Sequence, residues 1–304
     1  MSERVLSAVT GAFGFTGACI TRRLLAMGEG VVTLTGHPNR PNEFGDSVQV
    51  KPFNFDNPAQ LVESLQGIST LYNTYWIRFA HGELTFEKAV ANSKVLIRAA
   101  EDAGVRRMVH VSITNPSPDS RLPYFRGKAE VEKTIAESKL SYAILRPAVL
   151  FGDQGILIND IAWFLRRLPV FAIPGSGQYR LQPIFVEDLA DLAVEWGRKD
   201  ESVILDAVGP EAPTFDELVR QIRGAIGSRT LIVHVPPALA LVGTNVLGRI
   251  VGDVVLTPDE VMGLEANLLV SDREPLGKTR LSQWIESNAE WLGTQYMSEL
   301  RKHF

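Results

Sequence analysis

Three glycines near the amino terminus constrain this chain more than any other feature. They lie in the stretch Val-Thr-Gly-Ala-Phe-Gly-Phe-Thr-Gly, which runs from Val9 to Gly17. Gly11, Gly14 and Gly17 separate an apolar run from a segment expected to be helical. Such glycines allow a tight turn, a close approach of the backbone to pyrophosphate, and close packing of a helix on a strand. An ordinary glycine-rich turn is the alternative, but this position favours a dinucleotide site at the amino end of a helix.

Strands and helices are expected to alternate through the first two thirds of the chain. The expected strands cover residues 5–9, 31–35, 48–53, 70–75, 107–113 and 142–146. The expected helices cover residues 16–27, 58–65, 85–103 and 124–138. Short apolar strands that alternate with helices predict a parallel, doubly wound Rossmann sheet. Its ligand crevice would lie at the carboxyl ends of the strands.

After Pro147 this pattern loosens. We expect a helix over 156–167, a loop rich in proline and glycine over 169–182, a helix over 186–196, a strand over 203–208, and mainly helix from Thr214 onward. The sequence therefore predicts two parts. One is a dinucleotide-binding domain of residues 1–150 plus about 183–209. The other is a smaller, mainly helical substrate lobe of residues 151–182 and 210–304.

Composition limits the partners that this α/β protein can have. A net charge of −4 over 304 residues offers no electrostatic case for nucleic acid. The five histidines are scattered without metal-ligand spacing, so no metal is expected. Cys19 is the single cysteine, so no intramolecular disulfide can form. The expected first strand follows Arg4 directly, and no apolar run free of charge reaches membrane-spanning length, so we expect a cytoplasmic protein.

The end of the second strand bears on the choice of cofactor. An acidic residue there normally binds the adenosine ribose and favours NAD. This strand instead ends Thr-Leu-Thr-Gly-His at residues 33–37, without a carboxylate. Arg40, with Arg22 or Arg23, could supply positive charge to a 2′-phosphate, although solvated surface is the alternative for each. We therefore expect NADP(H), with NAD(H) as the alternative. Asp56 is either an adenine contact or the cap of the following helix.

Tyr124 and Lys128 form a Tyr-x-x-x-Lys pair at the start of an expected helix. A spacing of four places both side chains on one helical face. A nearby ammonium stabilises phenolate and lowers the pKa of tyrosine, so that Tyr124 could exchange a proton with a substrate oxygen. The spacing is common by chance, and its place beside a strand end gives it weight.

With these motifs the chain resembles the short-chain dehydrogenases/reductases, in the extended and atypical branch that includes NAD-dependent epimerases/dehydratases and NmrA-like proteins. Within that branch it is similar to the NADPH-binding accessory subunit of respiratory complex I. The resemblance covers nearly the whole chain. It rests on residues 10–17, the Tyr124–Lys128 pair, Arg-Pro-Ala-Val-Leu-Phe-Gly at 146–152, Phe-Val-Glu-Asp-Leu-Ala at 185–190, Val-Gly-Pro at 208–210 and Thr-Phe-Asp-Glu-Leu at 214–218.

The resemblance assigns roles to further residues. It places Asn73, Thr74, Pro147 and Val149 along the cofactor, and the full set of candidate cofactor-binding residues is then Gly11, Phe13, Gly14, Phe15, Thr16, Gly17, Arg40, Asp56, Asn73, Thr74, Tyr124, Lys128, Pro147 and Val149. The family's serine or threonine normally lies some two dozen residues before the tyrosine. Ser112 and Thr114 are the candidates here, but they are only about a dozen residues away, so the intervening loop is short or remodelled. A plain strand-end hydroxyl is the alternative for Ser112.

Aromatic residues stand where the family commonly has small ones. Tyr75 and Trp76 either shape the nicotinamide and substrate pocket or belong to the core. Arg180 resembles a position that often contacts the substrate, with a surface role as the alternative.

Two hypotheses about function follow. The first is hydride transfer between NADP(H) and a carbonyl or hydroxyl carbon of a hydrophobic small molecule, alone or within an epimerase/dehydratase cycle. The second is a non-catalytic NADP(H)-binding sensor or assembly protein. The apolar segment 235–256 fits a buried helix, a lid, an oligomer interface or a peripheral membrane contact. The resemblance also implies a homodimer through the helices expected over 85–103 and 124–138.

Overall fold

The computed structural model describes residues 5–300, which divide into two compact units. The first unit comprises Met1–Pro147 and Val186–Asp206, and the second comprises Ala148–Phe185 and Ala207–Phe304. Each unit has a hydrophobic core of its own.

The first unit is built on a seven-stranded sheet in which every neighbouring pair is parallel, in the order β3-β2-β1-β4-β5-β6-β10. Its strands are β1 (Leu6–Thr10), β2 (Gly30–Thr35), β3 (Val48–Pro52), β4 (Thr70–Asn73), β5 (Arg107–Val111), β6 (Ser141–Leu145) and β10 (Val203–Leu205). Its helices are α1 (Phe15–Ala26), α2 (Pro58–Leu65), α3 (Phe86–Asp102), α4 (Pro123–Ala136) and α6 (Val186–Gly197), with a short 3-10 turn at Gly45–Ser47. This is the Rossmann order, so the predicted doubly wound α/β fold is confirmed.

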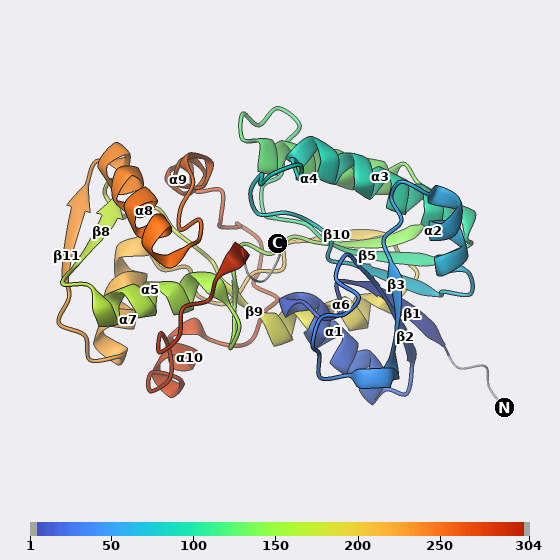
Figure 1. Ribbon diagram of the computed structural model, residues 1–304, viewed down its shortest axis with the longest axis horizontal. Helices are drawn as coiled ribbons and strands as arrows, with labels where there is room; N and C mark the ends of the chain where they lie inside the picture. The colour runs from blue at the N-terminus through green and yellow to red at the C-terminus, as the bar shows by residue number, and fades with distance from the viewer. Residues whose placement is uncertain (1–4, 301–304) are drawn as a thin grey trace. The chain divides into compact units, whose positions relative to one another are not determined.

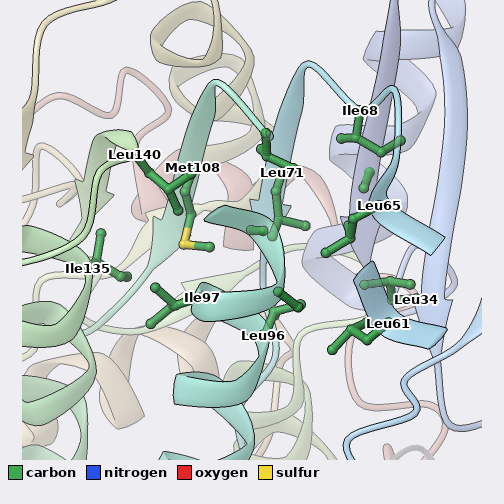
Figure 2. Packing of buried hydrophobic residues seen from close by; sticks show 14 of the residues in the cluster. Leu34, Leu61, Leu65, Ile68, Leu71, Leu96, Ile97, Met108, Ile135 and Leu140 are labelled. Atoms are coloured by element: carbon green, nitrogen blue, oxygen red, sulfur yellow. The ribbon is translucent and has the colours of Figure 1, made fainter. Parts of the chain in front are cut away.

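Helices cover both faces of this sheet. Figure 1 shows α1 and α6 on one face and α2, α3 and α4 on the other. Figure 2 shows how the second group of helices packs on the strands, with Leu61 of α2 beside Leu34, and with Leu96 of α3 and Ile135 of α4 on the side of the sheet that bears Leu71 and Met108. The inner strands β2 and β4 are buried at every position, as expected of a sheet covered on both faces, whereas the edge strands β3 and β10 are partly exposed.

Local sequence explains where the helices of this unit begin. Asn57 caps α2 by accepting a hydrogen bond from the Gln60 backbone N–H, and Pro58 occupies the first helical position. Thr85 caps α3 in the same way, through the Lys88 N–H. Helix α1 differs, because its cap is Gly14 and no side chain satisfies its first turn.

The second unit combines helices with two small parallel sheets. The helices are α5 (Ile156–Arg167), α7 (Phe215–Ala225), α8 (Pro237–Val251), α9 (Pro258–Glu265) and α10 (Leu281–Ser287). Strands β7 (Leu150–Phe151) and β9 (Ile184–Phe185) form one pair, and β8 (Val170–Pro174) and β11 (Leu231–Val235) form the other. Capping boxes at Thr214–Glu217 and Thr257–Glu260 define the starts of α7 and α9.

The prediction of a loop over residues 169–182 was wrong for its first part, which forms β8. Strand β11 was also missed within the segment expected to be mainly helical. These two strands pair with each other although they lie about sixty residues apart in the chain. Each is a short apolar run, and such runs become strands only when a distant partner supplies the hydrogen bonds. None of the helices among residues 5–300 is long and apolar enough to cross a membrane.

Candidate dinucleotide site and Tyr–Lys pair

The glycine loop closes the turn between β1 and α1 at the point where the strand order reverses. Gly11 has a φ of +65°, and its N–H donates to the Leu34 carbonyl. A Cβ on Gly17 would lie 2.1 Å from the Gly11 carbonyl oxygen, and one on Gly14 would lie 3.2 Å from the same atom. Each glycine therefore meets a steric demand, and α1 lies close against the turn.

This loop fits the pyrophosphate of a dinucleotide. The first turn of α1 contains no acidic residue, and no side chain caps it. Its N–H groups and the positive end of the helix dipole suit an anion. Phe15, Thr16 and Gly17 begin the helix, and Phe13 stacks against Phe44 beside it, with ring centres 6.4 Å apart.

The three arginines that could bind a 2′-phosphate lie in different surroundings. Arg22 pairs with Glu43 and Glu187, and Arg23 pairs with Glu187 and Asp191. These ion pairs engage both arginines with α6 and the loop after β2. Arg40 lies in that loop and is half-buried. Its backbone N–H donates to the His37 carbonyl and closes a turn.

The role of Asp56 as a helix cap was wrong, because Asn57 caps α2 while Asp56 is exposed beside it. The loop before the helix needs Asn54 at a φ of +47°, a conformation that asparagine tolerates. Asp56 as an adenine contact stays a prediction.

The carboxyl ends of β1 and β4 are joined by a buried polar network. The Thr10 hydroxyl accepts from the Thr74 and Tyr75 N–H groups, at 2.7 and 3.0 Å. Asn73 is fully buried, and its side chain contacts Thr10 and the Nδ1 atom of His110. The Asn73 side chain therefore fixes the turn that follows β4 and leads to Thr74.

His110 is neutral in this network. Burial places the pKa of its imidazole well below its usual value, and the charge of Lys128 lowers the pKa further. Its Nε2 atom is buried without a hydrogen-bond partner in the described structure.

Tyr75 and Trp76 lie in two different aromatic groups. Tyr75 packs with Phe53 and Phe55, and its hydroxyl accepts from Asn92 at 2.8 Å. Trp76 instead contacts Tyr124 and Phe86, with ring centres 5.9 and 6.4 Å away. Only Trp76 therefore adjoins the Tyr–Lys pair.

Lys128 lies beneath this second aromatic group. Its Nζ donates to the Val111 carbonyl at 2.8 Å and lies 4.6 Å from the centre of the Trp76 ring. The side chain is buried, and this burial lowers the pKa of the ammonium to about 7. A Cβ on Gly127 would lie 3.0 Å from the Trp76 ring, so the glycine makes room for the indole against α4.

Tyr124 occupies the first turn of α4, one turn before Lys128. Its ring is half-buried and lies edge-on to Trp76, Phe86 and Phe125. The structure thus brings Tyr124, Lys128 and Trp76 together on the same side of α4.

The Ser112 hydroxyl is hydrogen-bonded within the protein. Its hydroxyl donates to the Glu132 carboxylate at 2.5 Å, and Arg146 donates to both oxygens of that carboxylate. Ser112 is buried, and Thr114 is fully buried with its N–H bonded to the Pro147 carbonyl. Because a serine hydroxyl carries one proton, Ser112 in this arrangement cannot also donate to a substrate oxygen.

Glu132 was missed by sequence reasoning, although a signal for it exists. It follows Lys128 by four residues, as Lys128 follows Tyr124, so all three share one face of α4. Its carboxylate is buried and links α4 to the ends of β5 and β6 through Ser112 and Arg146.

Two of the predicted residues belong to the second unit. Val149 packs against the core of that unit, and its carbonyl accepts from the Ile184 N–H. Arg180 is exposed and donates to the Ala212 carbonyl. Among residues 5–300 no group of three or more histidine, cysteine, aspartate or glutamate side chains is arranged to hold a metal ion.

Comparison with known proteins agrees with this geometry. Residues 11–158 match the family described as NAD(P)H-binding. The chain is 25% identical over 289 residues to subunit 9 of the NADH dehydrogenase [ubiquinone] 1 alpha subcomplex from Arabidopsis thaliana mitochondria. That match covers 88% of this chain and 71% of the relative.

Solved structures share the fold. An NADPH-dependent quinone oxidoreductase from Escherichia coli, complexed with NADPH, has a TM-score of 0.75 at 19% identity, covering 93% of this chain and 99% of that one. The Citrobacter sp. triphenylmethane reductase, complexed with NADP(H), has a TM-score of 0.74 at 18% identity, with 94% and 99% covered. Residues 11–158 therefore match an NAD(P)H-binding family, the similarity to a subunit of NADH dehydrogenase is confirmed, and the solved structures show that the fold is shared.

Proposed function

We propose that this protein is an NADP(H)-dependent oxidoreductase acting on a carbonyl or hydroxyl carbon of a small, apolar molecule. The observation that carries the proposal is the placement of Tyr124. Its ring is half-buried among Trp76, Phe86 and Phe125, on the α4 face that also bears Lys128. Aromatic side chains suit a flat, apolar substrate, and the phenol is the polar group among them.

The preference for NADP(H) rests on the end of β2. Gly36 follows this strand in place of a carboxylate, so the repulsion that an acidic residue at this position would exert on a 2′-phosphate is absent. Arg22 and Arg23 are held in ion pairs with Glu187 and other carboxylates. Arg40 lies in the loop that follows β2, and we assign its guanidinium to the phosphate on the basis of that position.

Tyr124 is the proposed proton donor and acceptor. When bound, NADPH supplies the hydride for the reduction. The loop from Gly11 to Gly17 would bind the pyrophosphate, and the aromatic rings around Tyr124 would exclude water from the reacting carbon. Tyr124 would transfer its phenolic proton to the substrate oxygen, and Lys128 would set the charge beside that phenol.

Two related structures agree with such a substrate class. Their names describe a quinone oxidoreductase and a triphenylmethane reductase, and both names refer to compounds built on carbon rings. Hydride transfer within an epimerase/dehydratase cycle would use the same residues.

A non-catalytic NADP(H)-binding role is the second candidate, and a specific observation favours it. Lys128 is bonded to a main-chain carbonyl under Trp76, and the Ser112 proton is donated to Glu132. Both groups that would assist Tyr124 are thus engaged within the protein. Relatives that are subunits of NADH dehydrogenase are compatible with a binding or assembly role.

The test measures NADPH oxidation with a panel of quinones, aldehydes and ketones, for the wild type and for Tyr124→Phe. The variant should lose about 10²- to 10⁴-fold in kcat and keep its affinity for NADPH. Tyr142→Phe in β6 is the matched control and should keep full turnover. Turnover retained by Tyr124→Phe would exclude Tyr124 as the acid. Tight NADPH binding without turnover on any acceptor would support the binding role.

A further inference from the structure

The outer side of α8 exposes large apolar side chains to solvent. Leu239 and Val242 are each 61% exposed, Val246 is 53% exposed and Ile250 is 75% exposed. The opposite side of the helix contains the buried Ala240 and Gly248. An exposed apolar surface of this kind, contributed by one helix, indicates an interaction site rather than scattered surface residues.

The spacing of these residues makes them one continuous stripe. The four side chains follow one another at intervals of three, four and four residues along the helix. With about 100° of rotation per residue, they fall within a single narrow arc. Arg249 is exposed at the edge of this arc and is the only charged residue of α8.

Two segments that pack around α8 are rich in arginine and contain no carboxylate, although Asp253 follows the helix and Glu265 lies near Pro237 at its start. Residues 218–252 include no aspartate or glutamate but four arginines, namely Arg220, Arg223, Arg229 and Arg249. Residues 161–186 likewise contain no acidic residue and three arginines, namely Arg166, Arg167 and Arg180. Because the whole chain has a net charge of −4, acidic residues predominate elsewhere. The positive charge of these two segments is thus a local feature, reduced at Arg220 by its ion pair with Asp216.

Both segments meet in one part of the second unit. Strands β8 and β11 pair along their full length, and α8 packs on β8. Arg166, Arg167 and Arg229 line a shallow hollow between the end of α5 and the start of β11. Arg166 and Arg167 donate to main-chain carbonyls within residues 289–294. These carbonyls carry no formal charge, so they do not neutralise the two guanidinium groups.

The carboxyl end of α8 is connected to these arginines. Asp253 follows the helix and accepts from the Tyr296 hydroxyl at 3.1 Å. Tyr296 lies against Trp163 of α5, and the Arg167 guanidinium lies 4.6 Å from the centre of the same indole. The apolar stripe and the basic end of α5 thus belong to one contiguous part of the protein.

We propose that the outer side of α8 is a peripheral membrane-binding surface that inserts its apolar stripe into a bilayer containing anionic lipids. Leu239, Val242, Val246 and Ile250 enter the interfacial region, and the neighbouring arginines contact lipid phosphates. An apolar face bordered by basic residues is the composition that such surfaces require. With 15 residues α8 is too short to cross the hydrocarbon core, so it would lie in the plane of the interface.

Charge favours a lipid surface over a second copy of the chain. A two-fold symmetric dimer would bring the same patch of each copy together, and with it the arginines of both. Residues 161–186 and 218–252 of either copy have no carboxylate to pair with them, and of the carboxylates that border these segments Asp216 is already paired with Arg220 and Asp253 is buried. An anionic bilayer instead supplies the missing negative charge.

The experiment measures co-sedimentation of the full chain with vesicles of phosphatidylcholine alone and of phosphatidylcholine mixed with phosphatidylglycerol. We expect binding to the mixed vesicles that weakens as salt is added. The double variant Val246→Glu/Ile250→Glu should lose about tenfold or more in partitioning, because two apolar side chains are withdrawn from the interface. Arg249→Gln should lose about fivefold on the mixed vesicles and little on neutral ones.

Met27→Glu is the matched control, since Met27 is 50% exposed in the first unit, and it should bind like the wild type. Thermal unfolding and NADPH titration of every variant separate loss of folding from loss of binding. Equal binding by all variants would overturn the proposal. Absence of vesicle binding together with a dimer that Val246→Glu/Ile250→Glu dissociates would overturn it in favour of an interface between copies.

Discussion

The ammonium of Lys128 lies over the ring of Trp76, with its Nζ 4.6 Å from the ring centre, and donates a hydrogen bond to the Val111 carbonyl. A cation over an indole is stabilised by the ring quadrupole, more strongly when water is excluded. Trp76 thus both covers Lys128 and compensates part of the cost of its burial. The indole Nε1 is itself buried without a hydrogen-bond partner in the described structure.

Removing Trp76 should expose the Lys128 amine. In Trp76→Ala we expect acylation of Lys128 by a small amine reagent to accelerate by about tenfold or more, because the buried amine otherwise requires local opening. The comparison is made at about pH 10.5, where about half or more of the Lys128 amine is neutral whether the side chain is buried or exposed, with mass spectrometry of the labelled peptide. Trp163→Ala is the control, since its indole lies under Arg167. An unchanged rate in Trp76→Ala would show that the indole does not shield the lysine.

Lys128 should make stability depend on pH. Burial lowers its pKa from 10.5 to about 7 in the folded protein. Between these two values the unfolded chain binds the proton and the folded chain does not, so stability rises with pH in this window. Below it both states are protonated, and the folded state bears the cost of a buried charge.

Lys128→Met should therefore be more stable than the wild type at neutral pH, by on the order of 2 kcal/mol. Urea unfolding of both proteins at several pH values measures this difference, which should shrink as pH rises toward 10.5. A difference that is independent of pH would contradict the buried, titrating ammonium.

The close packing at Gly17 should matter for both the stability of the protein and its binding of NADPH. Gly17→Ala would place a methyl group 2.1 Å from the Gly11 carbonyl oxygen, so helix and turn must separate. We expect a loss of about 1–3 kcal/mol in stability and a marked loss of NADPH affinity. Gly224→Ala in α7 is the matched control, because no atom lies within 4 Å of the new Cβ. Tight NADPH binding by Gly17→Ala would exclude this loop as the pyrophosphate site.

The sequence predicts the first unit well because its signals are local. The glycine spacing, the alternation of apolar strands with helices and the Tyr–Lys spacing each depend on neighbouring residues. The partners of Lys128 and Ser112 come from distant segments. Trp76 precedes Lys128 by some fifty residues, and the Glu132–Arg146 ion pair joins a helix to the strand after it. Contacts between distant segments cannot be predicted from the spacing of residues in the sequence. The exception is Glu132, because Tyr124, Lys128 and Glu132 follow one another at intervals of four residues and so share one helical face.

The second unit is less predictable for the same reason. Strands β8 and β11 stabilise each other across a long separation, and each alone resembles a loop or part of a helix. The apolar character of α8 was plain in the sequence. That its apolar residues face outward became visible only with the fold, because a buried and an exposed apolar stripe have the same sequence pattern.

The most direct test of the account is a calorimetric titration of the nucleotide-free protein with NADPH and with NADH, for the wild type, Arg40→Gln and Gly36→Asp. Gly36 has no atom within 4 Å of an added Cβ, so the aspartate fits without steric conflict. We expect the wild type to prefer NADPH, Arg40→Gln to bind NADPH about tenfold more weakly while sparing NADH, and Gly36→Asp to prefer NADH. Equal affinity of the wild type for both cofactors, or unchanged preference in both variants, would contradict the assignment of the 2′-phosphate to Arg40 and with it the NADP(H) dependence.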